Sequence, residues 1–450
     1  MQKTYDLTKG RVATSLLGFF FPMLLTNTLQ QTYTFVDTII VGKGLGDQAL
    51  GSVGNLSSLM LLITGFLMGI TNGFGVNIAQ SFGAGNYKQL RKYIAHSVQL
   101  CGVITAALML IALSLLKPLL IVMKTSSFLL KDSLHYGYIV FGGLLVTAAY
   151  NLCSSILRAL GDSRTPFRAI VIASVTNVFL DCLLIFGLNT GVEGAALATV
   201  FSQAVSVLVC WHELRKNDLL RFQKEDFIKG HSVNIQLLSN GIPSALMNSV
   251  TAVGCMVVQG YVNAMSATFT SAYSACSKYL NLAMLPSLTA GFSLSAFVSQ
   301  NMGAGCIRRI REGVWTGIVI AFVSWLIIGS AMVFLPNQLA WMMLNETETI
   351  DLTADFLRIC GSTLLLLNLL FIFRNTVQGM GHPLIPMCSG ILEMVLRIPV
   401  IVFMMARMGF RATAYAESIA WVGALLLNVM AYFVFISRAT RIRRLSESVE

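Results

Sequence analysis

The sequence predicts an all-α membrane protein with twelve transmembrane helices in two pseudo-symmetric six-helix bundles. Three observations lead to this prediction. Of the 450 residues, 55% are apolar and only 11% are charged, whereas a soluble protein has about 25% charged residues. Apolar runs of about 20 residues, the length that crosses the hydrocarbon core, recur along the whole chain. Motifs of the first half return in the second half at a constant offset.

Apolar windows bounded by charged residues, Gly or Pro define the twelve predicted spans. In the first half they cover residues 14–37, 50–75, 95–116, 134–157, 167–188 and 194–212. In the second half they cover residues 235–260, 277–299, 314–335, 354–373, 385–406 and 414–437. The longest polar stretch between spans is 212–232. We therefore expect an amino-terminal bundle over residues 1–211, a cytoplasmic linker over 212–232 and a carboxy-terminal bundle over 233–450.

An internal repeat relates the two halves. The run QSFGAG at 80–85 returns as QNMGAG at 300–305, and LGDSRTP at 160–166 is matched by MGHPLIP at 380–386, both 220 residues later. Each repeat holds six spans, an even number, so both halves enter the membrane in the same orientation about a pseudo-twofold axis. This arrangement predicts a cleft between two bundles, which alternating access requires.

The net charge of +11 arises from 31 Lys and Arg against 20 Asp and Glu. In a soluble protein such an excess would suggest a nucleic-acid partner. Here most basic residues lie in the short segments on the same side as the N-terminus, as the positive-inside rule describes. We therefore expect a multi-pass protein of the plasma (inner) membrane, with both termini cytoplasmic, lipid around it and no nucleic-acid partner.

Asp37 is the first candidate for a functional residue. It lies in the first span, with Tyr33 one turn earlier. An ionised carboxylate at membrane depth costs several kcal/mol unless it faces a wet cavity or a partner, so such a residue marks a transport pathway. The alternative is that the first span ends sooner, so that Asp37 lies at the outer interface.

Asn177 and Asp181 lie four residues apart in the fifth span, so both project from one helix face. Thr199 in the sixth span can bring a hydroxyl to the same place. Three oxygen-bearing side chains with one negative charge suit Na⁺ or a carboxylate that takes up a proton. The alternative is a network of hydrogen bonds that ties the two helices together.

Glu393 and Arg397 are further candidates, four residues apart in the eleventh span. Their simplest interpretation is an intrahelical ion pair that neutralises two costly charges, and a role in gating is the alternative. The five histidines are isolated from one another, and no metal-binding cluster is evident. We expect no metal beyond a possible Na⁺ at the candidate site, no cofactor and no enzymatic activity.

The combined motifs resemble those of the multidrug and toxic compound extrusion (MATE) transporters. The resemblance covers nearly the whole chain and rests on VDTIIVG at 36–42, NVFLD at 177–181 and GAALAT at 194–199, together with the two repeated motifs. It implies an antiporter that exports small organic, often cationic compounds in exchange for Na⁺ or H⁺, without an obligatory protein partner.

The resemblance also implies where the coupling ion binds. In the family pattern an Asp of helix 1, an Asn and an Asp of helix 5 and a Thr of helix 6 form the amino-terminal cation site, and these positions are matched by Asp37, Asn177, Asp181 and Thr199. Some members place acidic ligands in the carboxy-terminal bundle. Here the middles of the seventh and tenth spans carry no acid, which argues against a second site there.

Two alternative functions belong to other classes. A lipid-linked oligosaccharide flippase would be favoured by a ring of basic residues in the cleft, and Lys278, Arg358 and Arg397 are too few for that. A membrane-embedded lipid-modifying enzyme would need Asp-rich or His-rich metal clusters at the interface, which the sequence does not offer.

Overall fold

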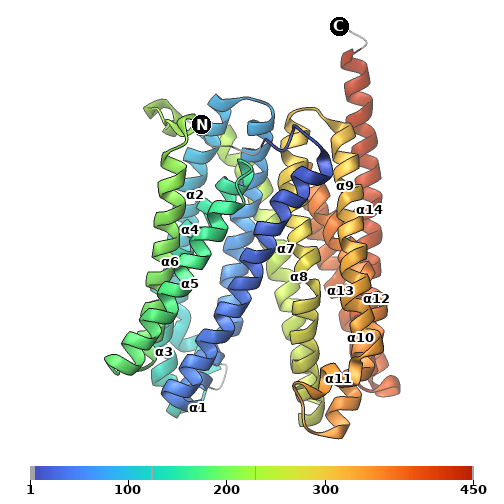
Figure 1. Ribbon diagram of the computed structural model, residues 1–450. Coiled ribbons are helices and arrows are strands. Elements are labelled where there is room, and N and C mark those ends of the chain that lie inside the picture. Colours follow the sequence, from blue (N-terminus) through green and yellow to red (C-terminus); the bar gives the residue numbers. More distant parts are fainter. Residues whose placement is uncertain (1–5, 123–124, 229, 448–450) are drawn as a thin grey trace. The chain divides into compact units, whose positions relative to one another are not determined.

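The computed structural model describes residues 6–122, 125–228 and 230–447 (Figure 1). Every regular element within these ranges is a helix, which confirms the predicted all-α class. Eleven helices are long and apolar enough to cross a membrane. A twelfth span results when the helices Leu129–Gly142 and Leu144–Ala159, bent by 43° at their junction, are taken as one. Each predicted span therefore has a helical counterpart.

Contacts between residues divide the chain into two units. The amino-terminal unit takes in Phe21–Ala245, and the carboxy-terminal unit takes in Leu7–Phe20 together with the chain from Leu246 onward. The start of α1 (Val12–Gly83) therefore belongs with the second half of the sequence, and the start of α7 (His231–Asn263) belongs with the first half. The expected division into bundles at residues 212–232 stays a prediction.

The amino-terminal unit contains most of α1 and the start of α7. Between them lie α2 (Tyr87–Val122), α3 (Ser127–Gly142), α4 (Leu144–Ala159), α5 (Arg164–Asp181), the π-helix η1 (Cys182–Gly187), α6 (Gly191–Arg215) and the short helices η2 (Asp218–Leu220) and η3 (Lys224–Phe227). The carboxy-terminal unit continues α7 with α8 (Ala267–Gly303), α9 (Ile307–Ser324), the π-helix η4 (Trp325–Gly329), α10 (Ser330–Phe334), α11 (Pro336–Trp341), α12 (Thr347–Gly379), α13 (Leu384–Met408) and α14 (Arg411–Glu447).

Helix α1 runs past the predicted end of the first span. Its one non-helical residue is Gly46, where φ is +84°, a left-handed conformation that glycine adopts at little cost. The predicted end at residue 37 is therefore too early, because the helix continues through Gly42, Lys43 and Gly44 and is interrupted only at Gly46. Asp37 consequently lies inside a continuous helix.

Close contact between backbones holds the start of α7 in the amino-terminal unit. A Cβ atom added at Gly69 would lie 2.5 Å from the Ala245 Cα, and one at Gly73 would lie 2.5 Å from the Asn240 carbonyl oxygen. Small residues at such positions allow membrane helices to approach closely. The preceding polar segment also docks on this unit, since the buried Asp226 carboxylate lies 3.2 Å from the Arg91 guanidinium.

The residues before α1 are held in the carboxy-terminal unit by Arg309. Its guanidinium donates hydrogen bonds to the carbonyl oxygens of Leu7, Lys9 and Gly10, at 3.0, 3.1 and 2.7 Å. The Leu7 amide in turn donates to the side chain of Gln300 at 3.0 Å. These bonds explain why the start of α1 belongs with the second half of the chain.

Both repeated motifs form helix-ending turns of the same geometry. Gly85 and Gly305 have φ of +67° and +68°, and Gly161 and Gly381 have φ of +85° and +89°. In each turn a glycine in the left-handed region ends a helix while the last carbonyls accept bonds from the turn amides. The repeat seen in the sequence is thus also a repeat of backbone conformation.

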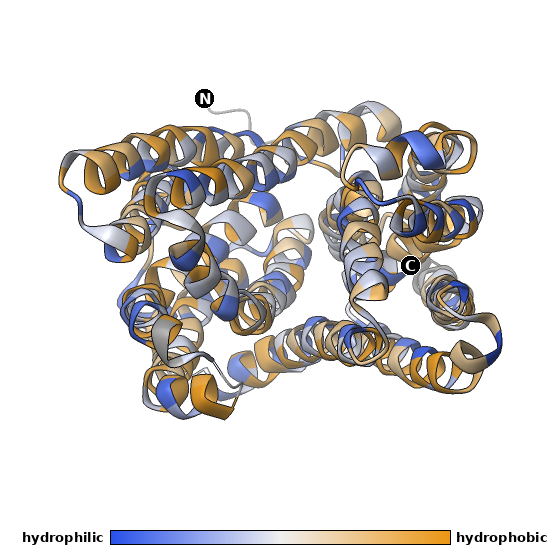
Figure 2. Ribbon diagram, turned by 90° about the horizontal axis from the view of Figure 1, so that it is seen from below, coloured by the Kyte–Doolittle hydropathy of each residue, from blue (hydrophilic) through white to orange (hydrophobic). Residues whose placement is uncertain are grey.

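Many large apolar side chains are exposed, and hydrophobic residues occur on helices of both units (Figure 2). Val103, Phe403 and Phe179 are 70%, 74% and 65% exposed. Water-soluble proteins rarely expose apolar surface on this scale. The exposed side chains are typical of a protein whose helices face lipid.

Candidate functional site

Packing around η1 positions Asp37 beside the fifth and sixth spans. Val41 and Ala49 of α1 form one apolar cluster with Ile185 of η1 and with Val192 and Ala195 of α6. The α1 residues of this cluster begin one helical turn after Asp37. The contact therefore sets the part of α1 that carries Asp37 against the helices that carry Asp181 and Thr199.

Helix α5 buries both of its predicted site residues. Asn177 and Asp181 are 0% exposed, and Asp181 is the last α-helical residue before the π-helix η1. Single-turn π-helices occur frequently at functional sites because they change the direction of side chains and free backbone groups. On α6, the half-buried Thr199 hydroxyl donates to the Ala195 carbonyl at 3.0 Å, and it also lies within hydrogen-bonding reach of Tyr33.

Several buried polar atoms of this cluster have no hydrogen-bond partner among the residues that the structure describes. They are one carboxylate oxygen of Asp37, both carboxylate oxygens of Asp181, and both amide atoms of Asn177. Asp37 and Asp181 lie close enough to interact electrostatically. Two neighbouring carboxylates that are shielded from water repel each other, and buried polar groups are nearly always satisfied. The cluster is therefore suited to a bound cation or a shared proton.

Two tyrosines complete this site, which we call the acidic cluster: Asp37, Asn177, Asp181, Thr199 and the tyrosines Tyr33 and Tyr136. Tyr33 lies near Thr199 and both carboxylates. Tyr136 of α3 lies near the same carboxylates and near Tyr33, and it was not among the residues predicted from the sequence. The sequence feature that could have indicated Tyr136 is a phenol in an apolar helix. The spacing of residues within one helix, however, does not show which other helix a side chain faces.

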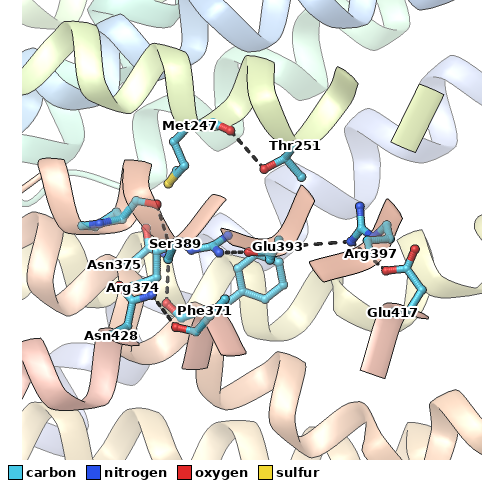
Figure 3. A network of polar contacts seen from close by, with 12 residues as sticks. Met247, Thr251, Phe371, Arg374, Asn375, Ser389, Glu393, Arg397, Glu417 and Asn428 are labelled. Atoms are coloured by element: carbon cyan, nitrogen blue, oxygen red, sulfur yellow. Dashed lines mark hydrogen bonds and ion pairs between the residues drawn. The ribbon is translucent and has the colours of Figure 1, made fainter. Parts of the chain in front are cut away.

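The carboxy-terminal unit contains a different set of charges, which we call the arginine–glutamate network. Arg374 of α12 donates to Glu393 of α13, and Arg397 of α13 lies 2.8 Å from the Glu417 carboxylate of α14. All four side chains are buried. Figure 3 shows them as one continuous chain of contacts, with Arg397 between the two carboxylates.

The expected pairing of Glu393 with Arg397 is not the main contact of either residue. Their charged atoms are 3.9 Å apart, and each binds a partner on another helix more closely. The partners Arg374 and Glu417 were not predicted from the sequence. Their signal was a charge within or directly after an apolar span, and the packing of α12, α13 and α14 decides which charges meet.

One protein-family model matches the chain twice, once in each repeat. The family model MatE matches residues 22–183 and, a second time, residues 243–403. The chain belongs to the MatE family. The first match contains Asp37, Asn177 and Asp181, and the second contains Arg374, Glu393 and Arg397, so each copy of the family pattern carries part of one polar site. The resemblance to the MATE transporters is confirmed.

Individual relatives agree with this assignment. The chain is 31% identical over 308 residues to the probable multidrug resistance protein YpnP of Bacillus subtilis, covering 68% of this chain and 69% of that protein. It is 27% identical to the probable multidrug resistance protein YoeA of the same organism, covering 85% and 84%. A crystal structure of a MATE protein in the bent conformation matches with a TM-score of 0.91 at 20% identity, covering 99% and 100%. The protein is a multi-pass membrane transporter and not an enzyme.

Proposed function

We propose that the protein is a secondary antiporter that exports small organic, often cationic compounds in exchange for Na⁺ or H⁺. The observation that carries the proposal is the acidic cluster, in which the buried Asp181 and the half-buried Asp37 lie together without a basic partner among the described residues. The relatives YpnP and YoeA are named as probable multidrug resistance proteins. Their names support organic compounds as the exported substrates.

The coupling ion would bind at Asp37, Asn177, Asp181 and Thr199. Na⁺ is a hard cation that prefers oxygen ligands, and these four side chains offer carboxylate, amide and hydroxyl oxygens. A proton shared between the two carboxylates would relieve the same repulsion. Either ion would be released when the cluster opens to the opposite side of the membrane, and no cofactor would be involved.

The test is to measure substrate affinity in detergent, with and without Na⁺ and at two pH values, for the wild type and Asp181→Asn. Asparagine keeps the shape of the side chain and loses the charge. We expect the variant to bind substrate without any response to ion or pH, because an ion that shifts affinity through a site cannot do so once the site is gone. Its melting temperature should stay near that of the wild type.

Asp351→Asn is the matched control, because Asp351 is exposed on α12 and its substitution should leave the ion response intact. An unchanged ion response in Asp181→Asn would move the coupling site elsewhere, with Glu393 as the next candidate.

We further propose that the protein lies in the plasma (inner) membrane, surrounded by lipid, with both termini cytoplasmic. The basic residues on the side of the N-terminus support this topology. A reporter fused after Glu450 and another in segment 212–232 should both be cytoplasmic. Reporters on opposite faces would contradict the parallel arrangement of the two repeats.

The runner-up function, a lipid-linked oligosaccharide flippase, would need basic residues free to bind pyrophosphate. Arg374 and Arg397 are already paired with glutamates, which favours the export of organic compounds instead.

A further inference from the structure

We propose that the Arg397 guanidinium is a built-in cation of the carboxy-terminal unit. It occupies the position that corresponds to the coupling-ion site of the amino-terminal unit. The inference rests on the proposed function for the meaning of the acidic cluster. Its own evidence is the register of the repeat and the geometry of the arginine–glutamate network.

The repeat places Arg397 at the position of Asn177. The two residues are 220 positions apart, the same offset that relates Gly161 to Gly381. Because these two glycines adopt the same left-handed conformation, at φ of +85° and +89°, α5 and α13 begin after equivalent turns. The Arg397 guanidinium therefore starts from the helix position that carries the Asn177 amide.

The other charges of the network replace uncharged residues of the first half. In the same register, Arg374 corresponds to Ser154, Glu393 to Ala173, and Glu417 to Leu197. Four charges thus occur together in one repeat, two of each sign. Buried ion pairs cost desolvation energy that apolar residues of similar volume avoid, and the first repeat manages without these four. Their joint presence indicates that a balanced set of two positive and two negative side chains in the second repeat replaces the site of the first repeat that needs an added cation.

The first helix of each repeat shows the converse change. With the offset of 221 that relates Pro22 to Pro243, Tyr33 corresponds to Gly254 and Asp37 corresponds to Val258. Helix α7 thus brings no carboxylate, and at Gly254 it brings no side chain. A Cβ added at Gly254 would lie 3.5 Å from the Arg397 guanidinium nitrogen. The position that carries the Tyr33 side chain in the first repeat is thus a glycine next to the Arg397 guanidinium in the second repeat.

The terminal nitrogens of the Arg397 guanidinium face three acceptors, whereas its buried Nε has no hydrogen-bond partner among the described residues. The guanidinium lies 2.8 Å from Glu417 and 3.9 Å from Glu393, and it donates to the Cys255 sulfur at 3.6 Å. Arg374 neutralises the remaining charge of Glu393. With two guanidinium groups for two carboxylates, the network offers no net charge to a mobile cation, so ion coupling is confined to the acidic cluster.

Removal of the guanidinium should therefore create a cation site. In Arg397→Ala, Glu417 keeps its carboxylate and loses its cation. We expect a lower melting temperature for the purified protein, and a rise that saturates as guanidinium or methylguanidinium is added at millimolar concentration, because a ligand that binds the folded state stabilises it. Urea, which is planar but uncharged, should give no such rise.

Two controls make the test decisive. Wild type, in which the site is filled, and Arg397→Ala/Glu417→Gln, in which the charge is balanced again, should show no saturable response to guanidinium. Arg397→Asn, which restores the amide of the first repeat, should gain stabilisation by Na⁺. Equal guanidinium responses in the single and double variants, or none in the single variant, would overturn the proposal.

The yield of folded variant protein decides the question if Arg397→Ala does not fold. If only Arg397→Ala/Glu417→Gln gives folded protein, the proposal is supported. If neither variant folds, Arg397 has a structural role beyond balancing charge, and the proposal is overturned. The stability assay needs no transport, so its outcome is independent of the proposed function. Absence of ion-coupled export in the wild type would refute the proposed function separately, and ion-coupled export that survives in Asp181→Asn would place the coupling site outside the acidic cluster.

Discussion

The acidic cluster and the arginine–glutamate network occupy related positions of the two repeats and treat buried charge in opposite ways. In the amino-terminal unit, Asp37 and Asp181 have no basic partner among the described residues that act on them. In the carboxy-terminal unit, each of the two network glutamates, Glu393 and Glu417, is paired with an arginine. The same backbone repeat thus supports a site that needs an exchangeable ion and a site that supplies its own. Duplication of a fold conserves helix positions and turns, while the chemistry follows a handful of side chains.

The comparison predicts its largest effect at Asp37. Asp37→Asn removes one of the two carboxylates whose repulsion requires an ion, so coupled export should be abolished while folding and membrane insertion are kept. The measurement is drug resistance and efflux in cells that produce equal amounts of wild type and variant. Wild-type resistance in Asp37→Asn would show that the amino-terminal unit does not carry the coupling ion.

A second prediction concerns stability, where the carboxy-terminal unit should be the more sensitive. Arg374→Met leaves Glu393 with Arg397 alone, at 3.9 Å. Removing one partner of a buried ion pair costs about 3 kcal/mol or more, so the variant should unfold at a clearly lower temperature. Asp181→Asn, which removes a charge that has no basic partner among the described residues, should not.

The control for this prediction is Arg308→Ala. Arg308 forms an exposed pair with Glu312 at 3.0 Å, and such pairs contribute about 0.5 kcal/mol. If Arg374→Met were as mild as Arg308→Ala, the network would not stabilise the unit, and the contrast between the two sites would be lost.

The sequence predicts one side of this comparison much better than the other. Periodicity places Asn177 and Asp181 on one helix face, and the family pattern links them to Asp37 and Thr199. Hydropathy likewise predicts the spans, since each is a predominantly apolar run. These features are local to one helix or carried by a motif, which is why they can be read without coordinates.

Features that depend on packing between helices could not be predicted. The pairing of Arg374 with Glu393, and of Arg397 with Glu417, depends on how α12, α13 and α14 meet. The start of α1 belongs with the carboxy-terminal unit through the carbonyl bonds of Arg309, and a backbone carbonyl leaves no mark in composition. The run of α1 to Gly46 was missed because its last turns contain a lysine and two glycines.

The smallest expected effect separates an ion ligand from a structural hydroxyl at Thr199. The Thr199 hydroxyl donates within its own helix, to the Ala195 carbonyl at 3.0 Å, so Thr199→Val should change stability by less than about 1 kcal/mol. If the oxygen also binds the coupling ion, the ion concentration that half-saturates transport should rise about tenfold, equivalent to about 1.4 kcal/mol.

Thr316→Val provides the comparison for Thr199→Val. The Thr316 hydroxyl makes the same bond in α9, to the Glu312 carbonyl at 2.9 Å, and lies in the other unit. It should show the same small change in melting temperature without any change in ion dependence. A loss of stability in Thr199→Val with an unaltered ion dependence would instead assign Thr199 to the contact between helices, and would leave the two carboxylates and Asn177 as the ligands of the ion.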